Sequence, residues 1–248
     1  MTSQTAPLVD LADVKLTLDG AAGPVNILRG LDLSIGAGET VGVVGPSGSG
    51  KTTLLMLVAG LERASSGRVR VAGHDLSALD EDRLALFRRH HVGIVFQSFH
   101  LVPTMTALEN VAIPLELAGD AAAFAKAQGA LEAVGLGHRL THYPGQMSGG
   151  EQQRTALARA MVGEPDLLLA DEPTGNLDGE NGAHVVELMF DLARRRGTTL
   201  VLVTHDPGLA QRCGRVIRIA DGRVVGDERG SDEVHTRPGA EAGRAVRA

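Results

Sequence analysis

The stretch GPSGSGKTT at residues 45–53 constrains this chain more than any other, because it matches the pattern G-x-x-x-x-G-K-[ST]. An apolar run at residues 41–44 precedes it, and a helix-like run at residues 54–59 follows. A strand that leads through such a loop into a helix leaves backbone N–H groups free to face an anion. The context therefore predicts a phosphate-binding loop and disfavours the alternative, a glycine-rich turn that merely precedes a lysine.

Each residue type in this loop has a task in phosphate binding. Gly45, Gly48 and Gly50 allow the backbone to fold tightly around a phosphate group. Lys51 can reach the β- and γ-phosphates of a nucleotide, and the Thr52 hydroxyl can hold Mg²⁺. The residues of the predicted loop are Gly45, Pro46, Ser47, Gly48, Ser49, Gly50, Lys51, Thr52 and Thr53.

Composition narrows the class of protein. With 248 residues, of which 43% are apolar, the chain can bury a sizeable core. A net charge of −6 without any basic block disfavours nucleic acid as a partner, and 2% aromatic residues leave few platforms for stacking bases. The single Cys213 cannot form an internal disulfide, which is consistent with a reducing cytosol.

The sequence offers no segment that would enter a membrane. Residues 1–14 have neither a basic start nor an apolar block, which predicts that there is no signal peptide. The apolar run at residues 54–61 is much shorter than the ~20 residues needed to cross a bilayer. Action at a membrane would therefore require another chain that spans it.

Hydrophobic periodicity in the first third of the chain indicates an antiparallel sheet. Residues 8–18, 31–35 and 68–73 alternate between apolar and polar, as half-exposed strands do. Residues 20–26 read as the loop of a hairpin between the first two. We expect this sheet to lie beside the strand that carries the phosphate-binding loop.

Short apolar runs later in the chain indicate a parallel sheet. Residues 92–96, 167–170 and 199–204 are typical of strands buried on both faces. Residues 79–90 carry acidic side chains early and basic ones late, which suits a helix dipole, and residues 182–196 form a further predicted helix.

The remaining segments are predominantly helical. Residues 104–145 read as helices interrupted at Pro114, and residues 148–163 present an apolar helix face. A hairpin at residues 216–225 ends the predicted domain. Residues 227–248 have little apolar content and predict a disordered tail.

Two adjacent carboxylates, Asp171 and Glu172, follow the predicted buried strand at residues 167–170. Asp171 could hold Mg²⁺ through water, and Glu172 stands where it could polarise an attacking water. Two carboxylates are costly to bury without a cation. The alternative is an acidic pair that begins a helix before Pro173.

The stretch MSGGEQQR at residues 147–154 precedes a predicted helix. Ser148, Gly149 and Gly150 could form a second anion-binding site at the start of that helix. Taken alone, the stretch reads better as a capping box, because Glu151 follows Ser148 by three residues. Two further polar residues, Gln97 and His205, each follow a predicted strand, although single residues of these types are usually structural or exposed.

In this order and spacing, the motifs resemble the ATP-binding cassette of ABC transporters. The match covers about residues 8–226 and joins the phosphate loop, Gln97, MSGGEQQR, LLLADEP, GNLD at residues 175–178 and His205. Such a joint match is highly specific. The segments FQSFHLVPTMTALENV and DEPTGNLD are most similar in sequence to one branch of the family. That branch includes lipoprotein-releasing, macrolide-efflux-type and cell-division ATPase subunits of bacteria.

The resemblance implies a P-loop NTPase fold of class α/β with three parts. These are a parallel core sheet, an antiparallel β subdomain and an α-helical subdomain at about residues 104–160. Residues 1–7 would be a flexible N-terminus outside the cassette. The implied function is that of an ATP-binding and ATP-hydrolysing subunit that dimerises on ATP and drives conformational change in a separate membrane permease.

The resemblance also assigns roles to individual residues. In a head-to-tail dimer, Ser148 and Gly150 would contact the γ-phosphate held by the other copy, and Asp178 would link the two sites. Glu172 would be the general base. His205 would hold the γ-phosphate and the attacking water.

The implied cofactors are ATP and Mg²⁺, with Thr52, Gln97 and Asp171 at the metal. Gln97 would in addition sense the membrane partner, whose helix would dock in the region of residues 96–117. The implied partners are an integral membrane permease and a second copy of this chain, with no role for nucleic acid. The expected location is cytoplasmic, peripheral on the inner face of the cell membrane.

Two departures from the family's pattern stand out. Leu18 occupies the place where the family usually has an aromatic residue that stacks on adenine, so we expect weak selectivity for ATP over GTP. Met147 replaces the usual leucine, and Glu151 a common glutamine; the first change conserves volume and should have little effect.

The sequence disfavours two other functions. Soluble cassette ATPases that act in translation, DNA repair or chromosome organisation usually carry two cassettes or long coiled-coil arms, and this sequence has neither. A regulatory module without turnover is disfavoured because Glu172 and His205 are both present.

Overall fold

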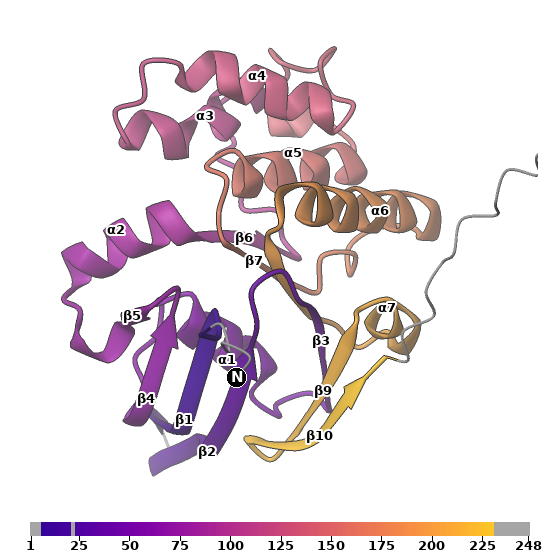
Figure 1. Cartoon of the computed structure of the whole chain (residues 1–248). Helices are drawn as coiled ribbons and strands as arrows, with labels where there is room; N and C mark the ends of the chain where they lie inside the picture. Colours follow the sequence, from indigo (N-terminus) through magenta and orange to yellow (C-terminus); the bar gives the residue numbers. More distant parts are fainter. Residues whose placement is uncertain (1–5, 21–22, 231–248) are drawn as a thin grey trace, which may run out of the picture.

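Two β-sheets and a set of helices make up residues 6–20 and 23–230, which are the residues that this computed structural model describes (Figure 1). The larger sheet has the strand order β10-β9-β3-β8-β7-β6. Its strands are β3 (Thr40–Val44), β6 (Val92–Phe96), β7 (Leu167–Asp171), β8 (Thr199–Val203), β9 (Arg215–Ala220) and β10 (Arg223–Arg229). All but β10 run parallel, which confirms the predicted parallel core sheet.

The central strands of this sheet are apolar because both of their faces are covered. In β7, Leu167 and Leu169 pack into the cluster formed with helix α1 (Lys51–Val58) and the antiparallel sheet. Leu168 and Ala170 point the other way, into a second cluster with helix α6 (Gly179–Arg196). A strand buried on both faces has no polar alternation, and this is the pattern that the sequence shows.

The smaller sheet is antiparallel and has the order β2-β1-β4-β5. Its strands are β1 (Val9–Gly20), β2 (Gly23–Ile35), β4 (Ser66–Val71) and β5 (His74–Asp75). The expected hairpin loop at residues 20–26 was too long, because pairing continues to Gly20 opposite Gly23 and includes Pro24 opposite Asp19. Strand β2 lies at the sheet edge, where the missing N–H of a proline is tolerated.

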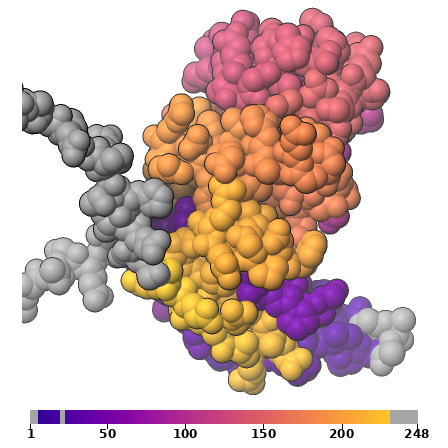
Figure 2. Space-filling view, turned by 90° about the vertical axis from the view of Figure 1, so that its right-hand side faces the viewer, coloured from indigo at the N-terminus to yellow at the C-terminus, as the bar shows by residue number. Residues whose placement is uncertain are grey.

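A layer of three helices, α3 (Ala107–Leu117), α4 (Ala123–Ala133) and α5 (Gly149–Met161), lies at the top of Figure 1. Their shared core includes Val111, Leu131 and Ala158. Figure 2 shows the layering from the side, with the last strands at the bottom. The expected interruption at Pro114 does not occur, since α3 continues through this residue with Leu115 buried. Packing of α3 therefore compensates for the hydrogen bond that proline cannot donate.

The remaining helices join these parts. They are α2 (Glu81–His91), the short α7 (Pro207–Gln211), and two 3₁₀ turns, η1 (Leu76–Ala78) and η2 (Pro144–Gln146). Helix α5 rests directly on β6, because a Cβ on Gly93 would overlap the carbonyl oxygen of Ala160. This contact between backbones brings the start of α5 to the same edge of the sheet as the ends of the parallel strands.

Strand β10 continues three residues past the expected domain end at residue 226. The extension is stabilised by Arg215, which is buried and donates from Nε and an Nη to the two carboxylate oxygens of Asp227, both at 2.7 Å. A further Nη atom of Arg215 lies 3.0 Å from Glu39 Oε2. Residues 227–229 thus belong to the sheet rather than to the predicted tail, whose residues 231–248 lie outside the described part, as do residues 1–5.

The Arg215–Asp227 pair predicts a pH dependence of stability. Hydrogen bonds from Arg215 hold the pKa of Asp227 below its ordinary value of 3.8, so the pair stabilises the fold above that pH and is lost as the pH falls through the lower, folded-state pKa. We expect Asp227→Asn to reduce the free energy of unfolding by about 1 kcal/mol at pH 7 and by less at pH 3. Urea titrations at the two pH values would measure this.

A matched control for this prediction is Glu228→Gln, because Glu228 forms an ion pair with Arg218 in which both side chains are exposed to solvent. This variant should change the free energy of unfolding by only a few tenths of a kcal/mol. An equal loss for Asp227→Asn at pH 3 and pH 7 would contradict the electrostatic account.

Candidate active site

The phosphate loop connects β3 to α1, as predicted. Gly45, Gly48 and Gly50 have φ values of 157°, 75° and 101°, which side chains other than glycine rarely adopt. At Gly45 a Cβ would also overlap the carbonyl oxygen of Ile219, so that only glycine fits. The loop conformation is therefore fixed by its glycines before any ligand binds.

Lys51, the first residue of α1, folds back over this loop. Its Nζ donates to the carbonyl oxygens of Gly45, at 2.8 Å, and Pro46, at 2.9 Å. The Ser49 hydroxyl is buried and has no hydrogen-bond partner among the described residues. A lysine held at the mouth of a loop of free N–H groups, with a spare hydroxyl donor, suits the binding of a phosphate group.

Thr52 and Asp171 bring two oxygen ligands together between α1 and the end of β7. The Thr52 hydroxyl donates to Asp171 Oδ1 at 3.3 Å. Burial raises the pKa of Asp171, and the hydrogen bond from Thr52 partly opposes that effect. A hydroxyl beside a half-buried carboxylate is the hard oxygen donor set that Mg²⁺ prefers, and a cation would offset the cost of burying the charge. The residues present therefore fit the ion.

Glu172 and His205, the two predicted catalytic residues, meet at the ends of neighbouring strands β7 and β8. The Glu172 carboxylate lies 2.8 Å, Oε2 to Nδ1, from the His205 ring. Glu172 has a φ of 47°, a strained value for this residue, and its N–H donates to the carbonyl oxygen of Val203. The turn aims the carboxylate out of the sheet, while the histidine side chain is 77% exposed.

Gln97 follows β6 but faces the GNLD segment in this structure. Its Nε2 donates to Asn176 Oδ1, and Asn176 Nδ2 donates to the Gln97 carbonyl oxygen, both at 3.1 Å. Gly175 makes room for this amide, since a Cβ there would lie 2.7 Å from Gln97 Nε2. Within the described residues no hydrogen bond joins Gln97 to Thr52 or Asp171, so its place at the metal stays a prediction.

The second candidate anion site is built around the starts of α5 and α6. Ser148 caps α5 in a capping box, in which its Oγ accepts from Glu151 N at 3.3 Å and its N–H donates to Glu151 Oε2 at 2.8 Å. The capping box that the sequence offered as an alternative is thus present. It leaves Gly149 and Gly150 at the open end of the helix, where N–H groups can still face an anion.

Asp178 caps α6 directly beside this helix start. It accepts from Asn181 N at 2.9 Å and Nδ2 at 2.8 Å, and these hydrogen bonds lower the pKa of Asp178. Asn181 lies against Gly150, where a Cβ would come within 2.8 Å of its Oδ1. Ser148, Gly149, Gly150 and Asp178 therefore form one group, which lies in a different layer from the phosphate loop at the start of α1 (Figure 1).

Two residues of α5 that sequence reasoning missed support the loops next to Gln97 and Glu172. Gln153 on α5 is fully buried, and its Nε2 donates to the carbonyl oxygens of Phe96 at 3.1 Å and Pro173 at 2.6 Å. Arg159, two turns further along α5, donates to the carbonyl oxygens of Phe99 and His100. The sequence did contain an indication that Gln153 is buried, because this glutamine lies on the same helix face as the apolar Leu157.

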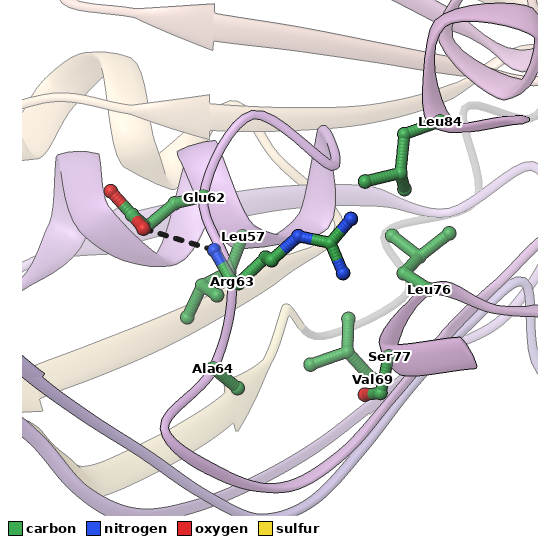
Figure 3. Close-up of a pocket in the computed structure, with 8 residues that line it drawn as sticks. All are labelled: Leu57, Glu62, Arg63, Ala64, Val69, Leu76, Ser77 and Leu84. Atoms are coloured by element: carbon green, nitrogen blue, oxygen red, sulfur yellow. Dashed lines mark hydrogen bonds between the residues drawn. The ribbon is translucent and has the colours of Figure 1, made fainter. Parts of the chain in front are cut away.

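The pocket in Figure 3 lies apart from these groups and contains none of the predicted site residues. It is bounded by the end of α1, β4, η1 and α2, and Arg63 points into it. Arg63 already donates to the Leu79 carbonyl oxygen at 2.9 Å, and its N–H donates to Glu62 at 3.0 Å. One guanidinium nitrogen of Arg63 and its backbone N–H are therefore bound by the protein itself.

These groups define a P-loop nucleoside triphosphatase. They are a glycine loop that ends in a lysine, a hydroxyl beside a carboxylate, and a second carboxylate next to a histidine. Comparisons with known proteins specify the family. The family model described as ABC transporter matches residues 28–175. The ATP-binding cassette MJ0796, solved as a dimer in a post-hydrolysis state bound to ADP and Pi, has a TM-score of 0.83 and 36% identity, covering 90% of this chain and 99% of that one.

Similar sequences have related names. The ABC transporter ATP-binding protein YbbA of Escherichia coli K12 is 49% identical over 219 residues, which are 88% of this chain and 96% of YbbA. The lipoprotein-releasing system ATP-binding protein LolD of Geobacter metallireducens is 50% identical over 89% of this chain and 99% of LolD. The macrolide export ATP-binding/permease protein MacB of Marinobacter nauticus is 48% identical over 89% of this chain but 34% of MacB.

This chain belongs to the ABC transporter family. It is an ATP-binding subunit of the LolD and MacB type and an ATP hydrolase, as the resemblance implied. These findings favour a transporter subunit over a cassette that acts on nucleic acid or ribosomes. None of the helices in the described part of the chain is long and apolar enough to cross a membrane.

Proposed function

We propose that two copies of this chain close head to tail on two ATP molecules, each held between the phosphate loop of one copy and the Ser148 group of the other. The observation that carries this proposal is the division of the site. Lys51 lies at the start of α1 behind the phosphate loop and Glu172 directly follows β7, whereas Ser148 and Gly150 lie at the start of α5, beside α6. A two-fold axis completes both halves at once. That the similar cassette MJ0796 was solved as a dimer bound to ADP and Pi supports the association of two copies.

In this arrangement each residue has a chemical task. Lys51 and the loop N–H groups bind the phosphates, and Ser148 and Gly150 contact the γ-phosphate that the other copy holds. Glu172 accepts the proton of the attacking water, and His205, whose ring lies 2.8 Å from the Glu172 carboxylate, holds the γ-phosphate and that water. Asp178 links the two sites. Thr52, Asp171 and Gln97 would hold Mg²⁺, which neutralises phosphate charge when bound.

Dimerisation is the test of this proposal. Glu172→Gln, loaded with Mg-ATP, should elute from size exclusion with twice the monomer mass by light scattering. Adding Ser148→Arg should keep that variant monomeric, because the long side chain fills the second anion site. Ser77→Arg, on the exposed η1 turn, is the matched control and should still dimerise. A Glu172→Gln chain that stays monomeric with Mg-ATP would refute the proposal.

We infer that the partner is an integral membrane permease, with this chain cytoplasmic and peripheral on the inner face of the membrane. The alignment with MacB, named an ATP-binding/permease protein, covers 34% of that protein, so the matched part is compatible with a separate permease here. A groove also suits a docking helix. We name it the α2–α3 groove; its volume is about 360 Å³, and Ala85, Ile113 and Leu117 supply apolar walls.

Base selectivity should be weak, as the sequence suggested. Leu18 pairs with Val25 across the β1–β2 hairpin, and their side chains are 42% and 50% exposed, without an aromatic ring. We expect wild-type affinities for ATP and GTP to agree within about threefold, and Leu18→Tyr to tighten ATP binding roughly fivefold through stacking worth about 1 kcal/mol. Competition against a fluorescent ATP analogue would measure both.

The exposed Leu86 on α2 provides the control for this prediction, because Leu86→Tyr adds the same ring elsewhere. It should leave nucleotide affinity unchanged. Strong discrimination against GTP by the wild-type chain would show that another group reads the base.

A further inference from the structure

Glu151 places a negative charge at the helix end that the proposed function assigns to the γ-phosphate. Its Oε2 accepts from the Ser148 N–H at 2.8 Å, and its side chain is 13% exposed. The hydrogen bond from Ser148 holds the pKa of Glu151 below its ordinary value of 4.5, and the one from Arg139 adds to this effect, so Glu151 is ionised at neutral pH. Two anions repel strongly where little water screens them. An uncompensated Glu151 would therefore weaken the second anion site.

Arg139, on the loop between α4 and η2, supplies the opposite charge. Its Nε lies 2.8 Å from Glu151 Oε1. Of the basic side chains that the structure describes, Arg139 alone lies within 4.0 Å of Glu151. Both partners are mostly shielded from solvent, and a shielded pair retains more of its Coulomb attraction than an exposed one. Arg139 therefore cancels the charge of Glu151 and fixes the position of its carboxylate.

The loop that carries Arg139 is itself held in place. The carbonyl oxygens of Leu140 and His142 accept from the N–H groups of Leu108 and Ala107 at the start of α3, at 3.0 and 2.8 Å. His142 Nε2 lies 3.0 Å from an Nη atom of Arg139, and it must accept there because a guanidinium can only donate. The proton of the ring is then on Nδ1, which is buried without a hydrogen-bond partner among the described residues. The contact with Arg139 is thus kept at a cost of about 1–3 kcal/mol.

The charge of Glu151 is not needed to cap the helix. In a capping box the residue three positions after the cap is Glu or Gln, because either side chain can accept from the N–H of the cap. Glu151→Gln would therefore keep the cap and remove the charge. It follows that Arg139 matters for charge only as long as residue 151 is acidic, which distinguishes charge compensation from support of the loop.

We propose that Arg139 is a positioning residue of the second anion site. It cancels the charge of Glu151 and keeps that carboxylate on the Ser148 N–H, so that the start of α5 can accept the γ-phosphate of an ATP held by the other copy. The inference rests on the proposed function, because it assumes that two copies close on ATP. It adds a residue that touches neither nucleotide nor metal and yet sets how much ATP the closure requires.

A charge-removal cycle in the Glu172→Gln chain tests this role, with light scattering during a Mg-ATP titration as the readout. Arg139→Gln should raise the Mg-ATP concentration for half-maximal dimerisation on the order of tenfold, because Glu151 then repels the phosphate. Arg139→Lys retains the charge and should stay within about threefold of the parent. The decisive variant carries Arg139→Gln and Glu151→Gln together, and should return to within about threefold of the chain with Glu151→Gln alone.

Two controls accompany the cycle. Arg68→Gln breaks an exposed ion pair with Asp10 on the antiparallel sheet, so it should dimerise at the same Mg-ATP concentration as the parent. Binding of a fluorescent ATP analogue to monomers, measured at low protein concentration, should be unchanged by Arg139→Gln, because the phosphate loop belongs to another layer. Weaker binding by these monomers would contradict a role confined to the second anion site.

The outcomes separate this inference from the proposed function. A Glu172→Gln parent that stays monomeric with Mg-ATP would overturn both. A parent that dimerises, together with an Arg139→Gln variant that dimerises at the same Mg-ATP concentration, would overturn the role of Arg139 alone. A loss in Arg139→Gln that Glu151→Gln fails to restore would show that Arg139 supports the loop without acting through charge, and would refute the inference as well.

Discussion

The variant Glu172→Gln is expected to hydrolyse ATP about 10²–10⁴-fold more slowly than the wild-type chain while binding ATP with unchanged affinity. Glutamine keeps the shape of the side chain and can still contact His205, but it cannot accept the proton of the attacking water. The phosphate loop is untouched, because Lys51 and its two carbonyl partners lie on other segments. Phosphate release at saturating Mg-ATP and equilibrium binding of an ATP analogue would measure the two quantities.

The neighbouring acidic residue Glu180, exposed in the first turn of α6, offers a control of the same chemistry. Glu180→Gln should hydrolyse ATP within a factor of two of wild type. If Glu172→Gln turned over ATP at the normal rate, the general base would have to be another group.

A second large effect is expected for Lys51→Met, which should weaken ATP binding on the order of 100-fold and abolish measurable hydrolysis. Methionine fills similar space but cannot make charge-assisted hydrogen bonds to phosphate oxygens, each worth about 1.5–3 kcal/mol. Part of that gain is already offset in the free protein, since Lys51 must leave the carbonyl oxygens of Gly45 and Pro46. Isothermal titration with Mg-ATP would give the affinity.

Lys126→Met is the corresponding control, since Lys126 lies on α4 and pairs with Asp120 on the surface. Its affinity for ATP should equal that of the wild-type chain. Tight binding by Lys51→Met would mean that the backbone N–H groups of the loop suffice for phosphate.

Sequence reasoning predicted the core of the site because parallel strands constrain it strongly. Strands that lie side by side in a parallel sheet end at the same edge, which brings Glu172, directly after β7, close to His205, which follows β8. The 2.8 Å contact between Glu172 and His205 confirms this proximity. The capping box at Ser148 was also readable, since it depends only on residues three apart.

The features that sequence reasoning missed depend on tertiary context. Pro24 and Pro114 read as breaks, yet an edge strand tolerates the first and helix packing the second. Local patterns gave no sign that Arg159 would support Phe99 and His100, because the partners are 59 and 60 positions apart and bond through backbone carbonyl groups. The orientation of Gln97 toward Asn176 likewise depends on how two loops pack.

The absence of a side chain at Gly93 has a mechanical consequence. Helices and sheets usually pack through interlocking side chains, which permit small sliding movements. At Gly93, in contrast, the backbone of β6 directly contacts the backbone of α5 at Ala160. If α3, α4 and α5 tilt during the ATP cycle, the C-terminal end of α5 and strand β6 must therefore move together as one rigid unit. The bending is left to the connections on either side, at residues 97–106 and 134–148.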